Sequence, residues 1–366
     1  MKILYITPTS IIEVNGGTRN YRRGYDMCCS IAGKSNVFTD YTLDQSAGRH
    51  TKQFRHLFYG LYWDMPPRKR KTIFDMISTQ GIDVVYLASS SLGKFAQVIK
   101  KVFPNVKVIV FFENLEADYS KSIIATSSFK GKLIHSHNYY LNKVCEKLAC
   151  KYADKIISLN KRDADAILRH YGRKPEFIAP ICLNDEFNPI YLEEHKNEIP
   201  VGLMVGSNFP PNKSGLTWFI HNVLPHVNMN LIVVGSGMDR LKDEFEGIPR
   251  LEIHGFVEDL NEYYAKADYM ISPIFAGSGM KVKTAEAMEF GKFIFAGPEA
   301  ATGYDFSENE LIVCHDADEF ISSINNFKRP ANWNGFVQSS RDLYLNNYSY
   351  SRSLEIFGQV FKSLSV

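Results

Sequence analysis

This sequence has few features of three kinds: paired cysteines, an excess charge of one sign, and long apolar runs. Its six cysteines form no C-x-x-C pair and have no histidine at metal-ligand spacing, so we expect neither a metal site nor a disulfide framework. The net charge of +2 argues against a nucleic-acid partner. No apolar run reaches the length of about 18 residues that spans a bilayer, and the apolar start of the chain is too short for a signal peptide. We therefore expect a cytoplasmic protein.

The size and composition are those of a two-domain globular protein. A chain of 366 residues fits two domains of average length, each able to bury a core. Aromatic residues make up 13% of the sequence, enough to supply stacking surfaces for sugars or bases beside those rings that belong to the core.

One stretch, residues 272–291, combines a strand end, a glycine turn and a helix. The apolar run before it predicts a buried strand, which Pro273 ends because proline cannot donate a ladder hydrogen bond. The sequence Gly-Ser-Gly at 277–279 favours a tight turn. From Met280 the apolar spacing predicts a helix that ends at Gly291. The result is a helix N-terminus with no bulky side chain in front of it.

Such a helix N-terminus attracts anions, and two lysines strengthen the attraction. Its first N–H groups have no partner within the helix. Lys281 and Lys283 in the first turn would each destabilise a bare helix by about 0.3–1 kcal/mol, and a bound polyanion would explain them. Glu286 lies one to two turns further, within reach of a sugar hydroxyl. The alternative is an ordinary strand–turn–helix whose glycines only make the turn.

The start of the chain repeats this order of strand, glycine loop and helix. Residues 2–7 predict a buried strand, and residues 21–32 predict a helix. Between them, Gly16 and Gly17 allow close approach of the backbone to a ligand, and Arg19 offers a partner for a phosphate. The alternative is a flexible loop with a solvated arginine.

Two acids follow the predicted strand at residues 106–112. Glu113 and Glu116 would lie at the carboxyl end of that strand, where parallel sheets bind ligands. The alternative is that both acids only cap the helix that follows.

A basic and aromatic region extends from Arg49 to Lys71. Rings at an interface and cations on anionic headgroups would suit a membrane surface. Nucleic-acid binding and a solvated helix face are the alternatives. No nucleic-acid recognition motif accompanies the region.

Two segments resemble those of a known family. GSGMKVKTAEAMEFGKFIFAGPEAATGY (residues 277–304) is similar to the donor-binding segment of retaining GT-B glycosyltransferases of family four, the glycosyl transferases group 1. ADKIISLNKRDADAILRHYG (residues 153–172) resembles the last unit of their N-terminal domain. Within it, residues 154–160 predict a strand and residues 161–171 predict a helix opened by Asn160, and another helix is predicted just before it, from about residue 141 to residue 152. The first glycine loop, the loop at 206–215 and residues 254–257 match further features in the same order.

The resemblance implies the GT-B fold, which is an α/β fold. It has two Rossmann-like domains with a cleft between them and a C-terminal helix that crosses back to the N-domain. The implied parts are an acceptor-side domain, a linker, a nucleotide-sugar-binding domain and the returning helix, at residues 1–180, 181–200, 201–345 and 346–366.

The resemblance also implies a nucleotide diphosphate sugar as donor, retention at the transferred sugar, and no metal or other cofactor. Glu113 stands where relatives often have histidine and would hydrogen-bond the sugar or the acceptor hydroxyl, while Glu116 is the better matched acid. A glutamate often found eight positions before the helix glutamate is Ser278 here. The implied donor-binding residues are Gly16, Gly17, Arg19, Ser207, Asn212, Lys213, Gly255, Phe256, Ser278, Gly279, Met280, Lys281 and Glu286.

By this resemblance the chain is a hexosyltransferase of surface polysaccharide or glycoconjugate biosynthesis. Its acceptor would be a glycan or a lipid-linked molecule, and it would contact the inner face of the membrane peripherally. A nucleotide-sugar epimerase of similar fold is one alternative. The other is a non-enzymatic partner that binds nucleotide or glycan in a polysaccharide assembly complex.

Overall fold

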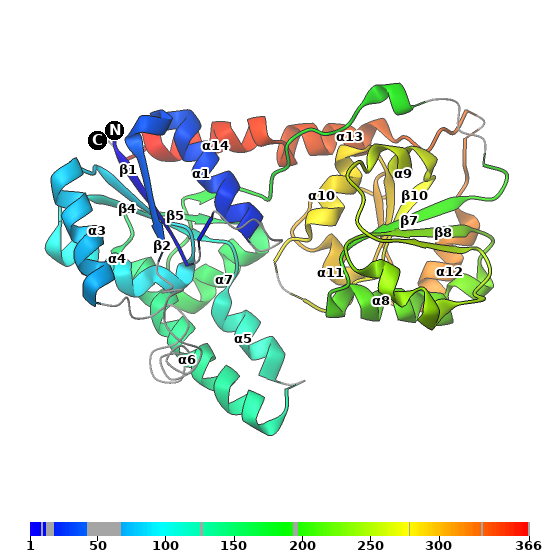
Figure 1. The fold of residues 1–366 in the computed structure, drawn as a ribbon, viewed down its shortest axis with the longest axis horizontal. Coiled ribbons are helices and arrows are strands. Elements are labelled where there is room, and N and C mark those ends of the chain that lie inside the picture. Colours follow the sequence, from blue (N-terminus) through cyan, green and yellow to red (C-terminus); the bar gives the residue numbers. More distant parts are fainter. Residues whose placement is uncertain are drawn as a thin grey trace. The chain divides into compact units, whose positions relative to one another are not determined.

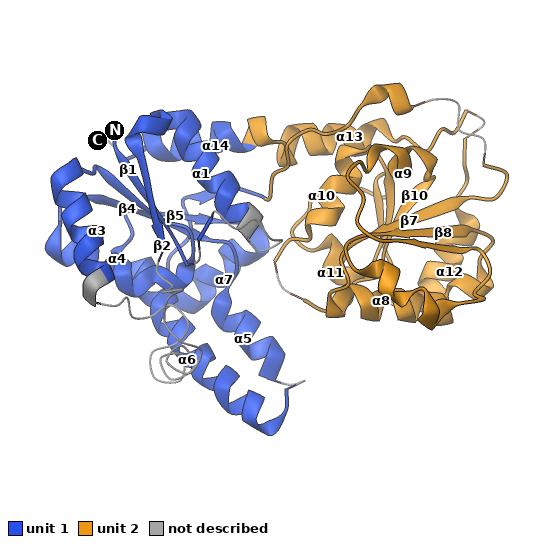
Figure 2. Ribbon diagram, in the orientation of Figure 1, with its two compact units in different colours: residues 1–180, 353–366 blue, residues 181–352 orange. Residues whose placement is uncertain are grey.

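The structure, a computed structural model, describes residues 1–8, 10–11, 18–41, 67–124, 127–192, 197–277, 279–330 and 332–364. The chain forms two compact units, one made of residues 1–180 with 353–366 and the other of residues 181–352 (Figure 2). Each unit is a parallel sheet with helices packed on it (Figure 1).

Unit 1 has six strands in the order β2-β1-β3-β4-β5-β6, all parallel. The strands are β1 (Ile3–Thr7), β2 (Val37–Tyr41), β3 (Val84–Leu87), β4 (Lys107–Phe112), β5 (Lys155–Ser158) and β6 (Phe177–Ile178). The helices are α1 (Thr18–Ala32), α3 (Pro67–Gln80), α4 (Gly93–Val102), α5 (Glu116–Ile124), α6 (Phe129–Tyr152), α7 (Lys161–Tyr171) and α14 (Tyr350–Lys362).

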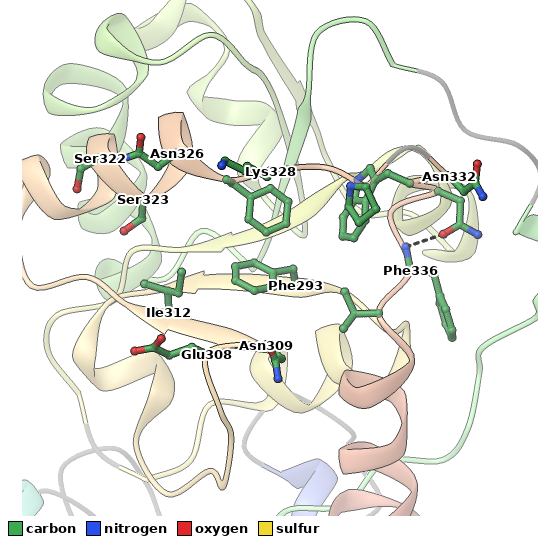
Figure 3. A pocket seen from close by; sticks show the side chains of 15 residues that line it. Phe293, Glu308, Asn309, Ile312, Ser322, Ser323, Asn326, Lys328, Asn332 and Phe336 are labelled. Atoms are coloured by element: carbon green, nitrogen blue, oxygen red, sulfur yellow. Dashed lines mark hydrogen bonds between the residues drawn. The ribbon is translucent and has the colours of Figure 1, made fainter.

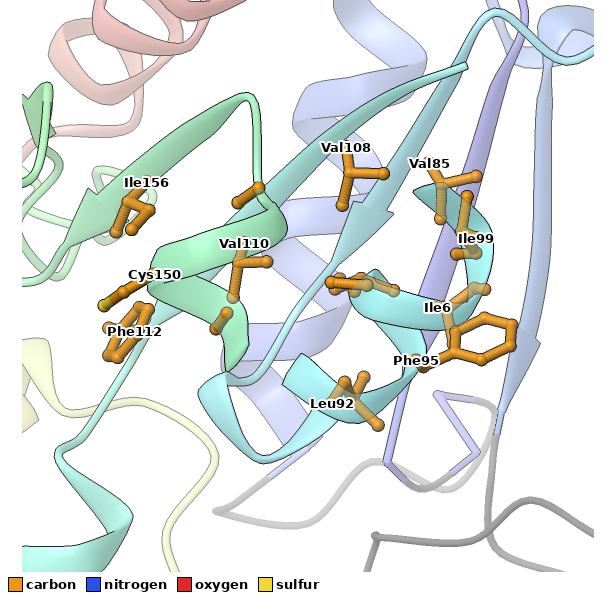
Figure 4. Close-up of a cluster of buried hydrophobic side chains, with 14 of the residues drawn as sticks. Ile6, Val85, Leu92, Phe95, Ile99, Val108, Val110, Phe112, Cys150 and Ile156 are labelled. Atoms are coloured by element: carbon orange, nitrogen blue, oxygen red, sulfur yellow. The ribbon is translucent and has the colours of Figure 1, made fainter. Parts of the chain in front are cut away.

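Both faces of this sheet are covered, because its strands are apolar on both sides. Val85 of β3 joins Phe95 and Ile99 of α4 in the core cluster of Figure 4. The next residue, Tyr86, points to the opposite face, where its ring stacks on Phe357 of α14 with centroids 6.0 Å apart. The C-terminal helix therefore packs on unit 1.

Unit 2 has six parallel strands in the order β12-β11-β10-β7-β8-β9. The strands are β7 (Val201–Val205), β8 (Asn230–Val234), β9 (Leu251–His254), β10 (Tyr269–Ser272), β11 (Phe293–Ala296) and β12 (Leu311–Val313). The helices are α8 (Pro210–Asn222), α9 (Asn261–Lys266), α10 (Val282–Glu289), α11 (Pro298–Ala301), α12 (Ala317–Asn326) and α13 (Gln338–Leu343).

The strand order places a topological switch point in each sheet. In unit 2 the chain runs outward from β7 through β8 to β9, then returns to β10 and runs the other way to β12. Open parallel sheets bind ligands at the carboxyl ends of the strands that flank such a point. In unit 2 these strands are β7 and β10, and in unit 1 they are β1 and β3.

Several elements differ from the sequence prediction. Helix α10 begins at Val282 rather than Met280, because Gly279 has a φ of 67° and Lys281 is extended at the N-cap. Helix α6 begins at Phe129, capped by the Ser128 side chain, well before the predicted start at residue 141. Within the ranges given above, no helix has the length and apolarity needed to cross a membrane.

Candidate functional site

The glycine turn after β10 has the Lys281 side chain packed against its backbone. Gly277 has a φ of 150°, and a Cβ built on it would lie 3.2 Å from Cε and 3.3 Å from Nζ of Lys281. Gly279 is in the left-handed region with a φ of 67°, which favours glycine. The Lys281 ammonium group therefore lies over the turn.

Local bonds hold Lys281 in this position. Its Nζ donates to the Gly279 carbonyl at 2.9 Å and lies 3.4 Å from Oε2 of Glu299 in α11. Its own carbonyl accepts a 2.7 Å bond from the buried Tyr304 hydroxyl. The side chain of Met280 is buried, so that residue offers a ligand only its backbone. The turn thus presents backbone groups and one lysine head.

Glu286, predicted to bind a sugar hydroxyl, is held by two side chains. Lys283 Nζ donates to both of its oxygens at 2.9 Å, and the Tyr264 hydroxyl donates to Oε2 at 3.1 Å. A carboxylate has about four acceptor positions, so one remains on Oε1. The Glu286 side chain is 14% exposed. The role of Tyr264 could not be predicted from the sequence, because it lies 22 residues before Glu286, in a different helix.

Contacts between α8 and the β10 loop join the two sides of the switch point. A Cβ on Gly215 of α8 would lie 2.2 Å from the Pro273 carbonyl oxygen, so only glycine permits this approach. Next to it, the Trp218 ring packs edge-on against Phe275 with centroids 4.5 Å apart. Helix α8, which follows β7, therefore packs against the loop after β10.

The predicted residues of the β7 loop are engaged with their neighbours. Asn212 donates from its side chain to the Ser207 carbonyl at 2.9 Å. Lys213 Nζ forms an exposed ion pair with Glu244 at 2.7 Å and lines a pocket of about 620 Å³ on that side of α8. A phosphate would have to compete with Glu244 for Lys213.

The β8 and β9 loops are fastened to the same edge of the sheet. The Gly235 N–H donates to the Gly255 carbonyl at 3.1 Å, and a Cβ on Gly235 would lie 1.9 Å from the Gly206 carbonyl oxygen. A Cβ on Gly255 would lie 2.9 Å from Oδ1 of Asp239. Phe256, which follows, is 71% exposed. An exposed ring at this edge is available for stacking.

In unit 1 the end of β4 carries two carboxyl groups with raised pKa values. Oε1 of Glu113 is shielded from solvent and has no hydrogen-bond partner among the described residues, while Asn20 and Tyr21 of α1 hydrogen-bond this carboxyl group. Burial, and then the charge of Glu116, raise the pKa of Glu113 to about 8. Burial raises the pKa of Glu116 to about 7. Near neutral pH Glu113 is therefore mostly protonated, whereas Glu116 is protonated only in part.

A third acid, Glu146 of α6, lies beneath this loop. It is fully buried and accepts bonds from the Ala117 N–H at 3.2 Å and from the Ser90 hydroxyl at 3.4 Å. The Tyr171 hydroxyl lies 2.5 Å from its other oxygen. Burial raises the pKa of Glu146 to about 7. A single acid within a long helix gives no sequence signal of such a position.

Some predicted residues lie outside the described part of the chain. These are Gly16, Gly17 and Ser278, while Arg19 is placed in α1 without a described side chain. Most of the region from residue 49 to 71 is also outside, although Lys69 pairs with Asp40. The roles of these residues, and the cleft that would bring Glu113 and Glu286 to one ligand, stay predictions.

A further pocket of about 830 Å³ lies elsewhere in unit 2, lined by β11, α12 and the segment that leads to α13 (Figure 3). Phe293, Lys328 and Phe336 are among its lining residues, and none of the predicted site residues is. Among the described residues, no group of three or more His, Cys, Asp or Glu side chains is placed to hold a metal ion.

The chain has two Rossmann-like units, and after the second unit its C-terminal helix packs on the first. This arrangement defines the GT-B fold. Solved structures agree over the whole chain. HepE from Anabaena, in complex with UDP, gives a TM-score of 0.68 at 13% identity, with 100% of both chains covered. Sucrose-phosphate synthase from Thermosynechococcus elongatus gives 0.69 at 15% identity, with 100% of this chain and 99% of that chain covered. The chain therefore has the GT-B fold.

The family match specifies the class further. Residues 199–328 match the family described as Glycosyl transferases group 1, a span that contains the whole sheet of unit 2, the glycine turn and Glu286. Residues 199–328 are therefore similar to group 1 glycosyltransferases, within a chain that has the GT-B fold. It is also 23% identical over 293 residues to an uncharacterized 44.6 kDa protein in the cps region of Klebsiella pneumoniae, covering 68% of this chain and 72% of that one.

Proposed function

We propose that this protein transfers a hexosyl group from a nucleotide diphosphate sugar to a glycan or lipid-linked acceptor, with retention, in surface polysaccharide biosynthesis. The observation that carries the proposal is the glycine turn at the β7/β10 switch point, with the Lys281 ammonium group above it. A diphosphate is the ligand chemistry that suits bare backbone beside a cation.

The donor would bind in parts along unit 2. Its diphosphate would meet the backbone of Gly279 and Met280 and the head of Lys281. The remaining acceptor position of Glu286 would take a ribose hydroxyl. Fixed positive groups at the turn would stabilise the charge that develops on the departing diphosphate, a role that requires no metal.

Unit 1 would contribute the acids near the transferred sugar. A carboxyl group that keeps its proton near neutral pH can donate a hydrogen bond, and burial gives Glu113 this property by raising its pKa to about 8. We propose that Glu113 donates to a hydroxyl of the sugar or acceptor, and that Glu116 lies beside it in the same site.

The comparisons suggest where to search for substrates. HepE was solved with UDP and also with UDP-glucose, so UDP sugars are the first donors to test. The Klebsiella relative belongs to a cps region, which favours a polysaccharide acceptor. Free thiols at all six cysteines suit a reducing cytoplasm. A peripheral contact through residues 49–71 would bring the protein to a lipid-linked acceptor.

A thermal-shift panel of UDP, GDP, ADP and TDP in the presence of a chelator tests the donor site. A ligand present at 100 times its Kd stabilises the folded state by about 2.7 kcal/mol. We expect a clear rise in Tm with one base, and a smaller rise with the matching monophosphate. If no nucleotide raises the Tm of well-folded protein, the proposed donor site is wrong, and a non-enzymatic role gains weight.

A further inference from the structure

The hairpin formed by α5 and α6 concentrates exposed apolar side chains. Figure 1 shows the two helices side by side in unit 1, with the end that they share extending away from the sheet. Sixteen large hydrophobic side chains of the described residues are exposed, and five of them lie between Tyr119 and Tyr140. Phe129 is 80% exposed, more than any other of the sixteen.

Three of these side chains form one stripe along α6. Phe129, Leu133 and Tyr140 are four and seven residues apart, a spacing that aligns them on one side of a helix. Leu133 is 62% exposed and Tyr140 is 64% exposed. From first to last the stripe is about 17 Å long at the helical rise.

The helix is anchored to unit 1 by its other side. Leu141, Cys145 and Ala149 are buried. A Cβ on Gly93 of α4 would lie 1.9 Å from the Cys145 carbonyl oxygen, so the two helices are in close contact there. Packing of α6 on the core therefore does not use the exposed stripe.

The stripe is bordered by positive charge alone. Lys130, Lys132 and Lys143 are exposed on α6, and Lys121 is exposed on α5. The sequence contains no aspartate or glutamate from residue 119 to residue 145. We name Phe129, Leu133 and Tyr140, with Lys130, Lys132 and Lys143, the α6 surface.

We propose that the α6 surface docks on an anionic lipid bilayer. An apolar stripe with lysines on both sides suits a helix that lies in the plane of the interface, with its rings among the acyl chains and its ammonium groups on the headgroups. A second copy of the chain fits less well, because an isologous contact would place lysines against lysines with no acid between them. This surface shares no residue with the 49–71 region or with the proposed donor site.

Sedimentation of the full chain with sucrose-loaded vesicles tests the proposal. We compare vesicles of pure phosphatidylcholine with vesicles that also contain about 30% phosphatidylglycerol, a fraction that gives the surface a negative potential. We expect at least tenfold stronger partitioning onto the anionic vesicles, weakened by salt. The double variant Lys130→Gln/Lys132→Gln should lose about 25-fold, since each lysine near such a surface contributes about fivefold.

A second pair, Phe129→Ser/Leu133→Ser, should lose at least tenfold. The matched control, Lys101→Gln/Val102→Ser at the end of α4, changes an exposed lysine and a 50% exposed valine and should bind like the wild type. Circular dichroism checks that each variant is folded. Nucleotide-induced Tm shifts should not change in any variant, so this proposal and the donor site fail separately.

Three results would overturn the proposal. One is equal binding to neutral and anionic vesicles, and another is an equal loss in the α4 control. The third is absence of vesicle binding by the wild type together with a concentration-dependent dimer, measured by light scattering, that the Phe129→Ser/Leu133→Ser variant abolishes. That result would assign the α6 surface to self-association.

Discussion

Substitution of Glu146 by glutamine should change how stability depends on pH. The native carboxyl group keeps its proton up to a pKa of about 7, whereas an unfolded chain releases it near 4.5. Between these values the native state binds more protons than the unfolded state, so the free energy of unfolding falls as pH rises. Below pH 4.5 the contribution is constant, and above about pH 7 the loss is complete.

The size of the effect follows from the surroundings of Glu146. The raised pKa corresponds to about 3 kcal/mol lost between the two limits. Glutamine has the shape of the protonated acid. Its oxygen can accept from the Ala117 N–H and the Ser90 hydroxyl, and its amide can donate to the Tyr171 oxygen. The variant should therefore exceed the stability of the wild type by less than about 1 kcal/mol at pH 5 and by up to about 3 kcal/mol at pH 8.

Urea unfolding followed by hydrogen–deuterium exchange in peptides of α6 and α7 measures this in unit 1 alone. The wild type and the variant share the other acids with raised pKa values, so the contributions of those acids to the pH dependence of stability largely cancel in the comparison. If the wild type and the variant lose stability in parallel between pH 5 and pH 8, Glu146 is not the group that makes stability depend on pH. Destabilisation of the variant at pH 5 would show instead that Glu146 is native in its charged form.

Two predictions concern the proposed donor and acceptor chemistry. Glu286→Gln should weaken nucleotide binding, measured by calorimetry, by about 1–3 kcal/mol, because a hydrogen bond to a charged group is lost. The exposed control Glu246→Gln should bind nucleotide like the wild type. Equal affinities of Glu286→Gln and the wild type would remove Glu286 from the site. The wild-type transfer rate should decline above pH 8, where Glu113 loses its proton, and Glu113→Gln, which still donates, should lack that decline. A decline of the same form in both proteins would assign it to another group.

Local signals in the sequence predicted much of the fold. Helix α7 was predicted with its correct ends because both caps are encoded nearby. The Asn160 side chain accepts a bond from the Asp163 N–H at 2.8 Å, and Gly172 ends the helix with a φ of 72°. The central strands were predicted within about two residues, because burial on both faces makes them continuously apolar.

Features that depend on distant neighbours could not be predicted. The first turns of α6 escaped detection because Phe129 and Leu133 lie on an exposed side, which removes the usual amphipathic pattern. The short edge strands β6 and β12 are too brief to leave a periodic signal. The bonds of Tyr264 to Glu286 and of Lys213 to Glu244 join segments more than 20 residues apart, and one sequence does not encode such pairs visibly.

Hydrogen–deuterium exchange with and without saturating nucleotide tests the central claim, that the donor binds at the turn after β10. We expect protection to be concentrated in peptides that cover residues 273–289 and 205–213, and to be stronger with the diphosphate than with the monophosphate. In Lys281→Gln the difference between diphosphate and monophosphate should shrink. Protection confined to the pocket around Phe293 and Phe336, with none at the glycine turn, would show that the nucleotide binds elsewhere in unit 2.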